Sequence, residues 1–188
     1  TLKNLPKIAM CNKLLKIKRL IPCNTTIIAL MNSMIDLEYY GVSPYELEAI
    51  YNTLSKFIGV CEKKLEDSEY LSLLNIEFPV PYDDYFFQSF GFDNWQKIKY
   101  IFKEMKRRRG RKDFKIILSF SGISTDTNSR LVFSLTSDIG PQFEYALEKL
   151  AHMADSVHTQ VKNLETNRQV MSYTYDVITM KWILSDKL

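Results

Sequence analysis

Glycine and proline are scarce in this chain of 188 residues, with six of each. Disordered and low-complexity segments are usually rich in one or both residues, so their scarcity argues against a long linker or a collagen-like repeat. Hydrophobic residues make up 46% and charged residues 25% of the sequence, which is ordinary for a globular protein. A chain of this length can bury a substantial core.

Cysteine and histidine are also few. Cys11, Cys23 and Cys61 contain no CxxC pair and match neither a disulfide framework nor a zinc cluster, and an odd number favours a reducing compartment. His152 and His158 would lie about 240° apart around a helix, so they cannot form the i, i+4 ligand pair of a helical zinc site. We therefore expect no metal ion and no cofactor.

Long apolar stretches are missing as well. No uncharged segment reaches the ~18 residues that a membrane span requires, and the most apolar window, residues 25–35, is followed directly by Asp36. The N-terminal segment has basic residues but no compact apolar region followed by a small-residue cleavage site. These observations predict a cytoplasmic protein that makes no contact with a membrane.

Motifs of common catalytic sites are absent. The six glycines are dispersed, so there is neither a GxGxxG nor a Walker motif, and no Gly-x-Ser-x-Gly occurs. Asp83 and Asp84 could act as an acid/base or metal pair, and Asp113 begins a fragment of a nuclease-like pattern. A small hydrolase or nuclease is therefore a third possibility, although capping the next helical turn is the commoner use of Asp83 and Asp84.

Charge is strongly separated along the chain, although the formal net charge is only +3. Residues 1–20 hold six basic residues and no acid, and residues 97–115 hold ten basic residues against two acids. Residues 21–96 hold twelve acids against three lysines. The opposite charges could pair across the fold, or the two basic segments could form one patch that attracts a polyanion. Both arrangements fit the sequence.

The basic run Lys106–Lys112 lies between a helical pattern and a strand pattern. Cations in a last helical turn complement the helix dipole, and Gly110 fits the position that ends the helix. This role accounts for Arg107–Arg109 but not for Arg111 and Lys112. The residues predicted to contact nucleic acid are Lys103, Lys106, Arg107, Arg108, Arg109, Arg111, Lys112 and Lys115.

The first part of the chain is predicted to be helical. Residues 25–40 are apolar on most sides, as in a buried helix, and Gly41 is a natural stop. Ser43-Pro44-Tyr45-Glu46 is a capping box with proline at the first helical position, and an apolar stripe extends this second helix to Leu65. We expect a helical hairpin within residues 1–68, packed on an α+β sandwich of residues 69–188 or continuous with it.

Residues 73–184 are predicted to run β-α-β-β-α-β. A weak edge strand ends at prolines near residue 80, and a helix from Phe92 ends in the basic run. Residues 114–120 and 131–135 alternate as a hairpin, and residues 170–184 form a last strand whose alternation loses phase near Asp176. This is the element order of ferredoxin-like folds: a small, mostly antiparallel sheet covered by helices.

A helix over residues 140–164 carries apolar residues in three heptads. It could form a coiled-coil dimer seam, although a helix lying across a sheet is the commoner arrangement. Tyr173 and Tyr175 share a strand face and could stack on bases, yet residues 130–135 lack the glycine and paired aromatics of an RNA-recognition module. No motif supports a named family.

From these patterns we expect a non-enzymatic binding protein that contacts a nucleic-acid backbone through its basic helix-to-strand corner. Arginine and lysine at such a corner project into solvent and add affinity that is salt-dependent and independent of sequence. The alternative is a homo-oligomeric or protein-partner scaffold without a nucleic-acid role. In that case the heptad helix would make a homodimer and the basic run would meet an acidic protein surface.

Overall fold

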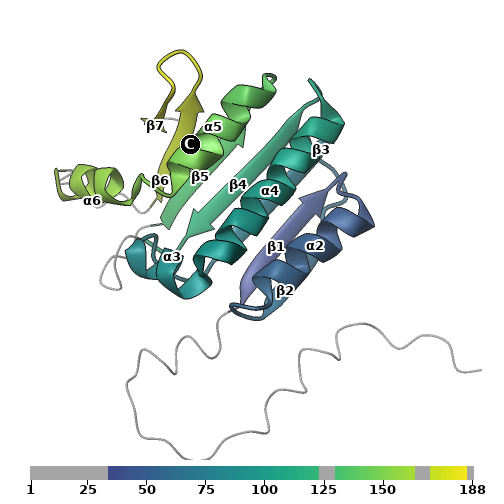
Figure 1. Cartoon of the computed structure of the whole chain (residues 1–188), viewed down its shortest axis with the longest axis horizontal. Coiled ribbons are helices and arrows are strands. Elements are labelled where there is room, and N and C mark those ends of the chain that lie inside the picture. The colour runs from purple at the N-terminus through teal and green to yellow at the C-terminus, as the bar shows by residue number, and fades with distance from the viewer. Residues whose placement is uncertain (1–33, 123–129, 164–169, 186–188) are drawn as a thin grey trace, which may run out of the picture. The chain divides into compact units, whose positions relative to one another are not determined.

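The computed structural model describes residues 34–122, 130–163 and 170–185 (Figure 1). They belong to one compact unit, Ser33–Leu188. At its centre is a single mixed sheet of seven strands in the order β2-β1-β3-β4-β5-β6-β7. The strands are β1 (Ile35–Tyr40), β2 (Val60–Lys64), β3 (Ser72–Phe78), β4 (Phe114–Phe120), β5 (Arg130–Thr136), β6 (Val170–Asp176) and β7 (Lys181–Ser185).

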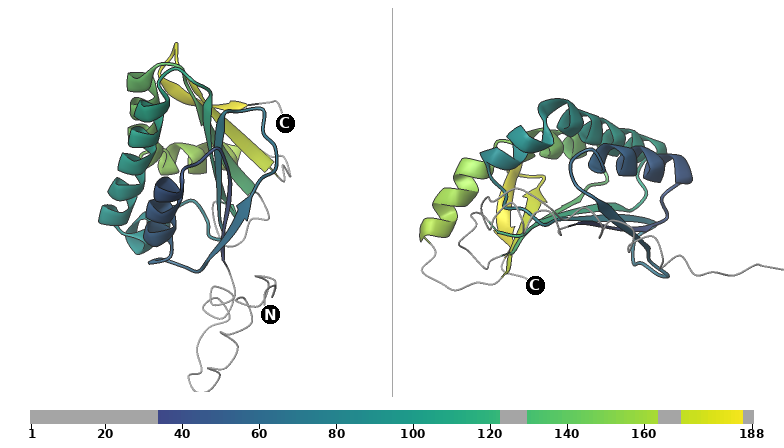
Figure 2. Two further views of the ribbon diagram at one scale, coloured as in Figure 1. Left: turned by 90° about the vertical axis from the view of Figure 1, so that its right-hand side faces the viewer. Right: turned by 90° about the horizontal axis from the view of Figure 1, so that it is seen from below.

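The longer helices connect parallel neighbours in the sheet. The pairs β1–β2, β3–β4 and β5–β6 are parallel, and parallel strands need a crossover connection, which is usually helical. Figure 2 shows α2, α4 and α5 side by side on one face of the sheet. The helices are α2 (Pro44–Leu54), α3 (Asp84–Phe90), α4 (Phe92–Arg109), α5 (Gly140–Leu150) and α6 (Ala154–Asn163).

The strand directions bring one end of each of three helices to the same end of the sheet's strands. The pairs β1–β3, β4–β5 and β6–β7 are antiparallel. The crossover helices α2 and α5 therefore run opposite to α4, which packs between them. The last turn of α4 consequently lies next to the first turns of both α2 and α5.

The core lies between the sheet and these helices. Strand alternation directs one set of apolar side chains toward the helices, and the rings of Phe78 and Phe120 stack with their centroids 5.0 Å apart. The fully buried Tyr82 donates its hydroxyl hydrogen bond to the carbonyl of Leu150, and burial raises the pKa of this phenol. Aromatic packing and this hydrogen bond thus hold α3 and α5 against the sheet.

The expected helical hairpin is wrong, and so is the small, mostly antiparallel sheet. Residues 35–40 form β1 in place of the end of the first helix, and the second helix ends at Leu54, before β2. Ile35 and Leu37 are fully buried, and a short continuous apolar run fits a buried strand as well as a buried helix. Residues 25–33 of the expected hairpin lie outside the described residues.

Three further expectations also need correction. β3 is not an edge strand, because it pairs with β1 and β4 on its two sides, and the prolines follow its last residue. The helix expected over residues 140–164 is divided into α5 and α6 by the turn at Ala151–Met153. The single last strand expected over residues 170–184 is divided into β6 and β7 by a chain reversal, which accounts for the loss of phase near Asp176. In this turn the Asp176 carboxylate accepts hydrogen bonds from the backbone N–H groups of Ile178 and Thr179.

Local signals are confirmed where they were strong. The Ser43–Glu46 capping box begins α2, and α4 ends at Gly110, whose φ of +62° favours glycine. β4 and β5 pair as an antiparallel hairpin, whose connecting residues 123–129 lie outside the described residues. In the described part of the chain, no helix is both long and apolar enough to cross a bilayer.

Gly41 should be much harder to replace than Gly110. Its φ is +61°, and a Cβ atom there would clash with the backbone carbonyl of Leu71. Gly110→Ala is a matched control, because φ is again positive but no atom lies within 4 Å of the added Cβ. We expect Gly110→Ala to cost about 1–3 kcal/mol of unfolding free energy and Gly41→Ala to cost about 2 kcal/mol more, measured by urea denaturation. Equal losses would contradict this packing.

Candidate functional site at the α4–β4 corner

The basic run does not form one uniform patch, because its members take different roles around the end of α4. We define the corner as the last turn of α4, the turn that follows it, and the neighbouring starts of α2 and α5. Some basic side chains are held inside this corner by hydrogen bonds, and others lie on its surface.

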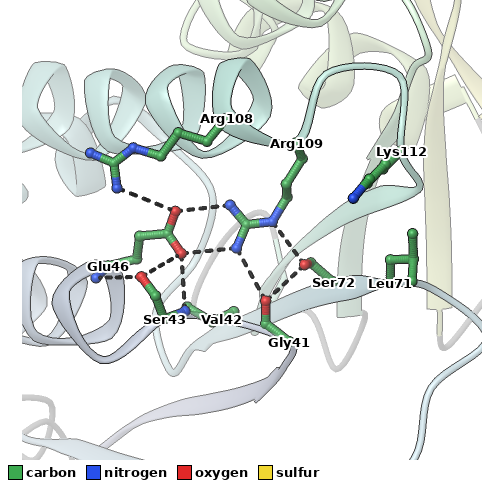
Figure 3. A pocket seen from close by; sticks show the side chains of 9 residues that line it. All are labelled: Gly41, Val42, Ser43, Glu46, Leu71, Ser72, Arg108, Arg109 and Lys112. Carbon is green, nitrogen blue, oxygen red and sulfur yellow. Dashed lines mark hydrogen bonds and ion pairs between the residues drawn. The ribbon is translucent and has the colours of Figure 1, made fainter.

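Arg109 is the structural centre of the corner. Its guanidinium group donates two hydrogen bonds of 2.8 Å to the two carboxylate oxygens of Glu46, a bidentate geometry that is among the strongest ion pairs in proteins. It also donates to Ser72 Oγ at 2.8 Å and to the carbonyl of Gly41 at 3.2 Å (Figure 3). Both partners of the ion pair are largely buried, with side chains 12% and 6% exposed. Arg109 is therefore committed to the fold.

Glu46 forms hydrogen bonds both at the start of α2 and with α4. Its carboxylate accepts a hydrogen bond from the backbone N–H of Ser43, which closes the capping box, while it also accepts both hydrogen bonds of Arg109. The hydrogen bonds from Arg109 lower the pKa of Glu46 to about 2, with a further contribution from Ser43, against the opposing effect of burial. The carboxylate is thus a built-in anion at the start of α2.

Three other predicted residues have partners nearby. Lys103 pairs with Glu148 at 2.7 Å, which ties α4 to α5, and the exposed Arg107 pairs with Glu104 one helical turn earlier at 2.6 Å. Lys115 is not at the corner: it lies on the face of β4 that points away from the helices, with its ammonium 4.7 Å from the ring centre of Tyr70.

Lys106 differs from all its neighbours. It is only 2% exposed, and its Nζ atom has no hydrogen-bond partner in the described part of the chain. Burial lowers the pKa of Lys106, and the charges of Asp138 and Asp113 act in the opposite direction. The sequence held a signal for this burial, since Lys106 follows the buried residues Ile98 and Phe102 at helical spacing.

Three basic side chains remain on the surface with weak or no pairing. Arg108 is 62% exposed and lies 3.7 Å from Glu46, outside the geometry of a short ion pair. Arg111 and Lys112 are exposed in the turn after Gly110, and neither forms an ion pair with another described residue. Arg107 adds a fourth exposed cation.

Two cavities lie on opposite sides of the end of α4. The first, of about 610 Å³, lies against the start of α2, and its polar groups are largely engaged with one another through Glu46 and Arg109 (Figure 3). The second, of about 380 Å³, lies between the end of α4 and the start of α5. Lys106 and Arg111 line this second cavity.

The acidic residues considered for catalysis are not brought together. The Asp83 carboxylate caps α3 by accepting a 2.8 Å hydrogen bond from the N–H of Phe86, as expected. Asp83 follows the end of β3 whereas Asp113 precedes the start of the parallel strand β4, so the two lie at opposite ends of the sheet. Among the described residues, no group of three His, Cys, Asp or Glu side chains could hold a metal ion.

The apolar and aromatic candidates serve the core. Phe143 and Leu147 of the heptad pattern are buried by their own chain, and the last two heptad residues, Val161 and Leu164, have no described side chain. Tyr173 is fully buried and Tyr175 is 8% exposed, so both pack between sheet and helices.

The chain matches no family model, no curated protein and no solved structure.

The corner was only partly visible in the sequence. The run itself was clear, but Glu46 and Ser72, the partners of Arg109, are distant from it in sequence. Residues 1–20, the other basic segment, lie outside the described residues, so a joint patch of the two segments stays a prediction.

Acid should weaken the corner through Glu46. Because its pKa in the folded state lies below the ordinary value of 4.5, the stabilisation is fully present above about pH 5 and is lost as the pH falls toward 2. We expect this carboxyl to contribute about 3 kcal/mol to the loss of unfolding free energy between pH 5 and pH 2. Urea denaturation at several pH values would measure this loss.

Glu46→Gln is the reference for that measurement. Glutamine at this position still completes a capping box, but it removes the charge that titrates. The variant should be less stable than wild type at pH 7 and should lose less stability on acidification. A pH dependence equal to that of wild type would contradict the role given to Glu46.

Proposed function

We propose that this protein is a non-enzymatic binding protein whose α4–β4 corner contacts the phosphate backbone of nucleic acid. One observation carries the proposal: four exposed basic side chains, at Arg107, Arg108, Arg111 and Lys112, cluster within six residues where α4 ends. Long, flexible cations of this kind reach phosphates without reading bases.

The surroundings of these side chains support the same function. The start of α5 lies beside the end of α4, and a helix N-terminus carries partial positive charge that favours anions. The ion pair of Arg109 with Glu46 fixes the end of α4 against the start of α2, so the exposed cations project from a rigid base. A surface cluster of cations is the kind of feature that attracts a polyanion.

The expected binding is electrostatic and insensitive to sequence. Tyr173 and Tyr175, the two tyrosines considered for stacking on bases, are buried and cannot make that contact. Affinity should therefore fall steeply with salt, because each phosphate contact releases counterions. Single-stranded and duplex nucleic acid should both bind.

Replacing Arg107, Arg108, Arg111 and Lys112 together by glutamine should abolish this binding. Each lost phosphate contact should reduce the slope of log affinity against log salt by about 0.7 for a single strand and about 0.9 for duplex DNA. Fluorescence anisotropy with a labelled oligonucleotide at several salt concentrations measures both affinity and slope.

The matched control replaces four lysines away from the corner, Lys56, Lys97, Lys149 and Lys181, by glutamine. It removes the same net charge, so it separates a local contact from a general electrostatic effect. The control should retain most of the binding. If both quadruple variants bind equally, or if the wild-type protein does not bind, the proposed function is wrong.

A further inference from the structure

The start of α5 differs from the start of α2. At α2, the Ser43 side chain caps the helix and the carboxylate of Glu46 provides a negative charge in its first turn. At α5, the corresponding positions are Ile139 and Gln142, which supply neither a side-chain cap nor a charge. The N–H of Gly140 has no partner within the helix, and Pro141 has no N–H at all. This helix start is therefore open to an external acceptor.

A second and independent observation lies in the same place. The ammonium group of Lys106 is buried without a hydrogen-bond partner among the described residues. An unpaired buried charge is costly and is usually matched by a partner of opposite charge. The side chain lines the second cavity, and its ammonium is near enough to Asp138, on the wall of the same cavity, to respond to that charge.

The cavity collects more positive than negative charge. It is lined by the four basic residues Lys103, Lys106, Arg107 and Arg111 and by the two acidic residues Asp138 and Glu144. Two of the basic residues are already paired with glutamates of the helices, Lys103 with Glu148 and Arg107 with Glu104. Lys106 and Arg111 have no such partner among the described residues, and Asp138 and Glu144 balance them in formal charge. An anion is therefore favoured by the buried ammonium and the open start of α5, not by an excess of free cations.

We propose that the cavity between the end of α4 and the start of α5 binds a phosphate group. A phosphate group offers oxygen acceptors in several directions, and the residues that line this cavity supply donors from different elements: the ammonium of Lys106, the guanidinium of Arg111 and the N–H of Gly140. A carboxylate is planar, carries one charge and satisfies fewer of these donors. The volume of about 380 Å³ leaves room for a substituent on the phosphate.

The difference between the starts of α2 and α5, on the two sides of α4, supports this assignment. On the α2 side the chain supplies its own carboxylate, Glu46, to a guanidinium and a helix start. On the α5 side a buried cation and a helix start are present, but no side chain of a described residue caps the helix, and the carboxylate of Asp138 accepts no hydrogen bond from Lys106. The site does not depend on the proposed nucleic-acid function, because a free phosphate, a phosphomonoester or a strand phosphate would each use the same donors.

Calorimetric titration with inorganic phosphate at constant ionic strength tests the site. We expect saturable binding with one site per chain, and Lys106→Met should weaken it by about tenfold or more. Methionine keeps an apolar stem in the buried position, so this variant should remain folded. Lys97→Gln is the matched control, since it removes one positive charge from the exposed surface of α4 near the other end of the helix, and it should change the affinity less than about twofold.

A second variant keeps the test independent of Lys106. Ile139→Asp places a carboxylate at the N-cap of α5, where the extended backbone allows it to accept the N–H of Gln142. We expect its thermal midpoint to equal or exceed that of wild type, while phosphate affinity falls by about tenfold or more, because a built-in anion now occupies the helix start. Such a result separates loss of the ligand from loss of the fold.

The same proteins titrated with a single-stranded oligonucleotide identify the source of the phosphate. Parallel loss of phosphate and oligonucleotide binding in Lys106→Met supports a site for a backbone phosphate. Loss of phosphate binding alone supports a site for a free phosphate or a phosphomonoester. No saturable binding of phosphate to the wild-type chain, or undiminished binding in both Lys106→Met and Ile139→Asp, would overturn the proposal.

Discussion

The buried ion pair between Arg109 and Glu46 is the interaction on which the corner depends. It joins the last turn of α4 to the first turn of α2, and Arg109 extends the link to Ser72 at the start of β3 and to the carbonyl of Gly41. Breaking one partner of such a pair typically costs about 3–5 kcal/mol, because the other charge stays buried. A residue from the middle of a basic run thus holds three segments of the sheet and helix layers in place.

The fixed position of Arg109 determines where the other basic side chains of the run lie. With the end of α4 fixed, Arg108, Arg111 and Lys112 project outward, while Lys106 turns into the interior on the side of α5. The two flanks of α4 then differ in one respect that matters chemically. The flank toward α2 contains its own anion, and the flank toward α5 contains a buried cation and an open helix start.

Sequence patterns predicted this structure only where a signal was local. The Ser43–Glu46 capping box and the end of α4 at Gly110 depend on neighbouring residues, and both are found as expected. The nature of residues 35–40 was not decided by periodicity, because a buried strand and a buried helix are equally apolar. The partner of Arg109 lies 63 residues away in the chain, and only the sheet order brings Glu46 to it. Four of the eight predicted site residues are exposed cations at the corner, whereas Lys106 is buried and Arg109 is largely buried.

A double-mutant cycle measures the central interaction directly. Urea denaturation at pH 7 of wild type, Glu46→Gln, Arg109→Met and the double variant gives the coupling free energy between the two side chains. If the ion pair holds the corner together, the double variant should be more stable than the sum of the single losses implies, with a coupling of about 2 kcal/mol or more. Additive losses, with a coupling within about 0.5 kcal/mol of zero, would contradict the account.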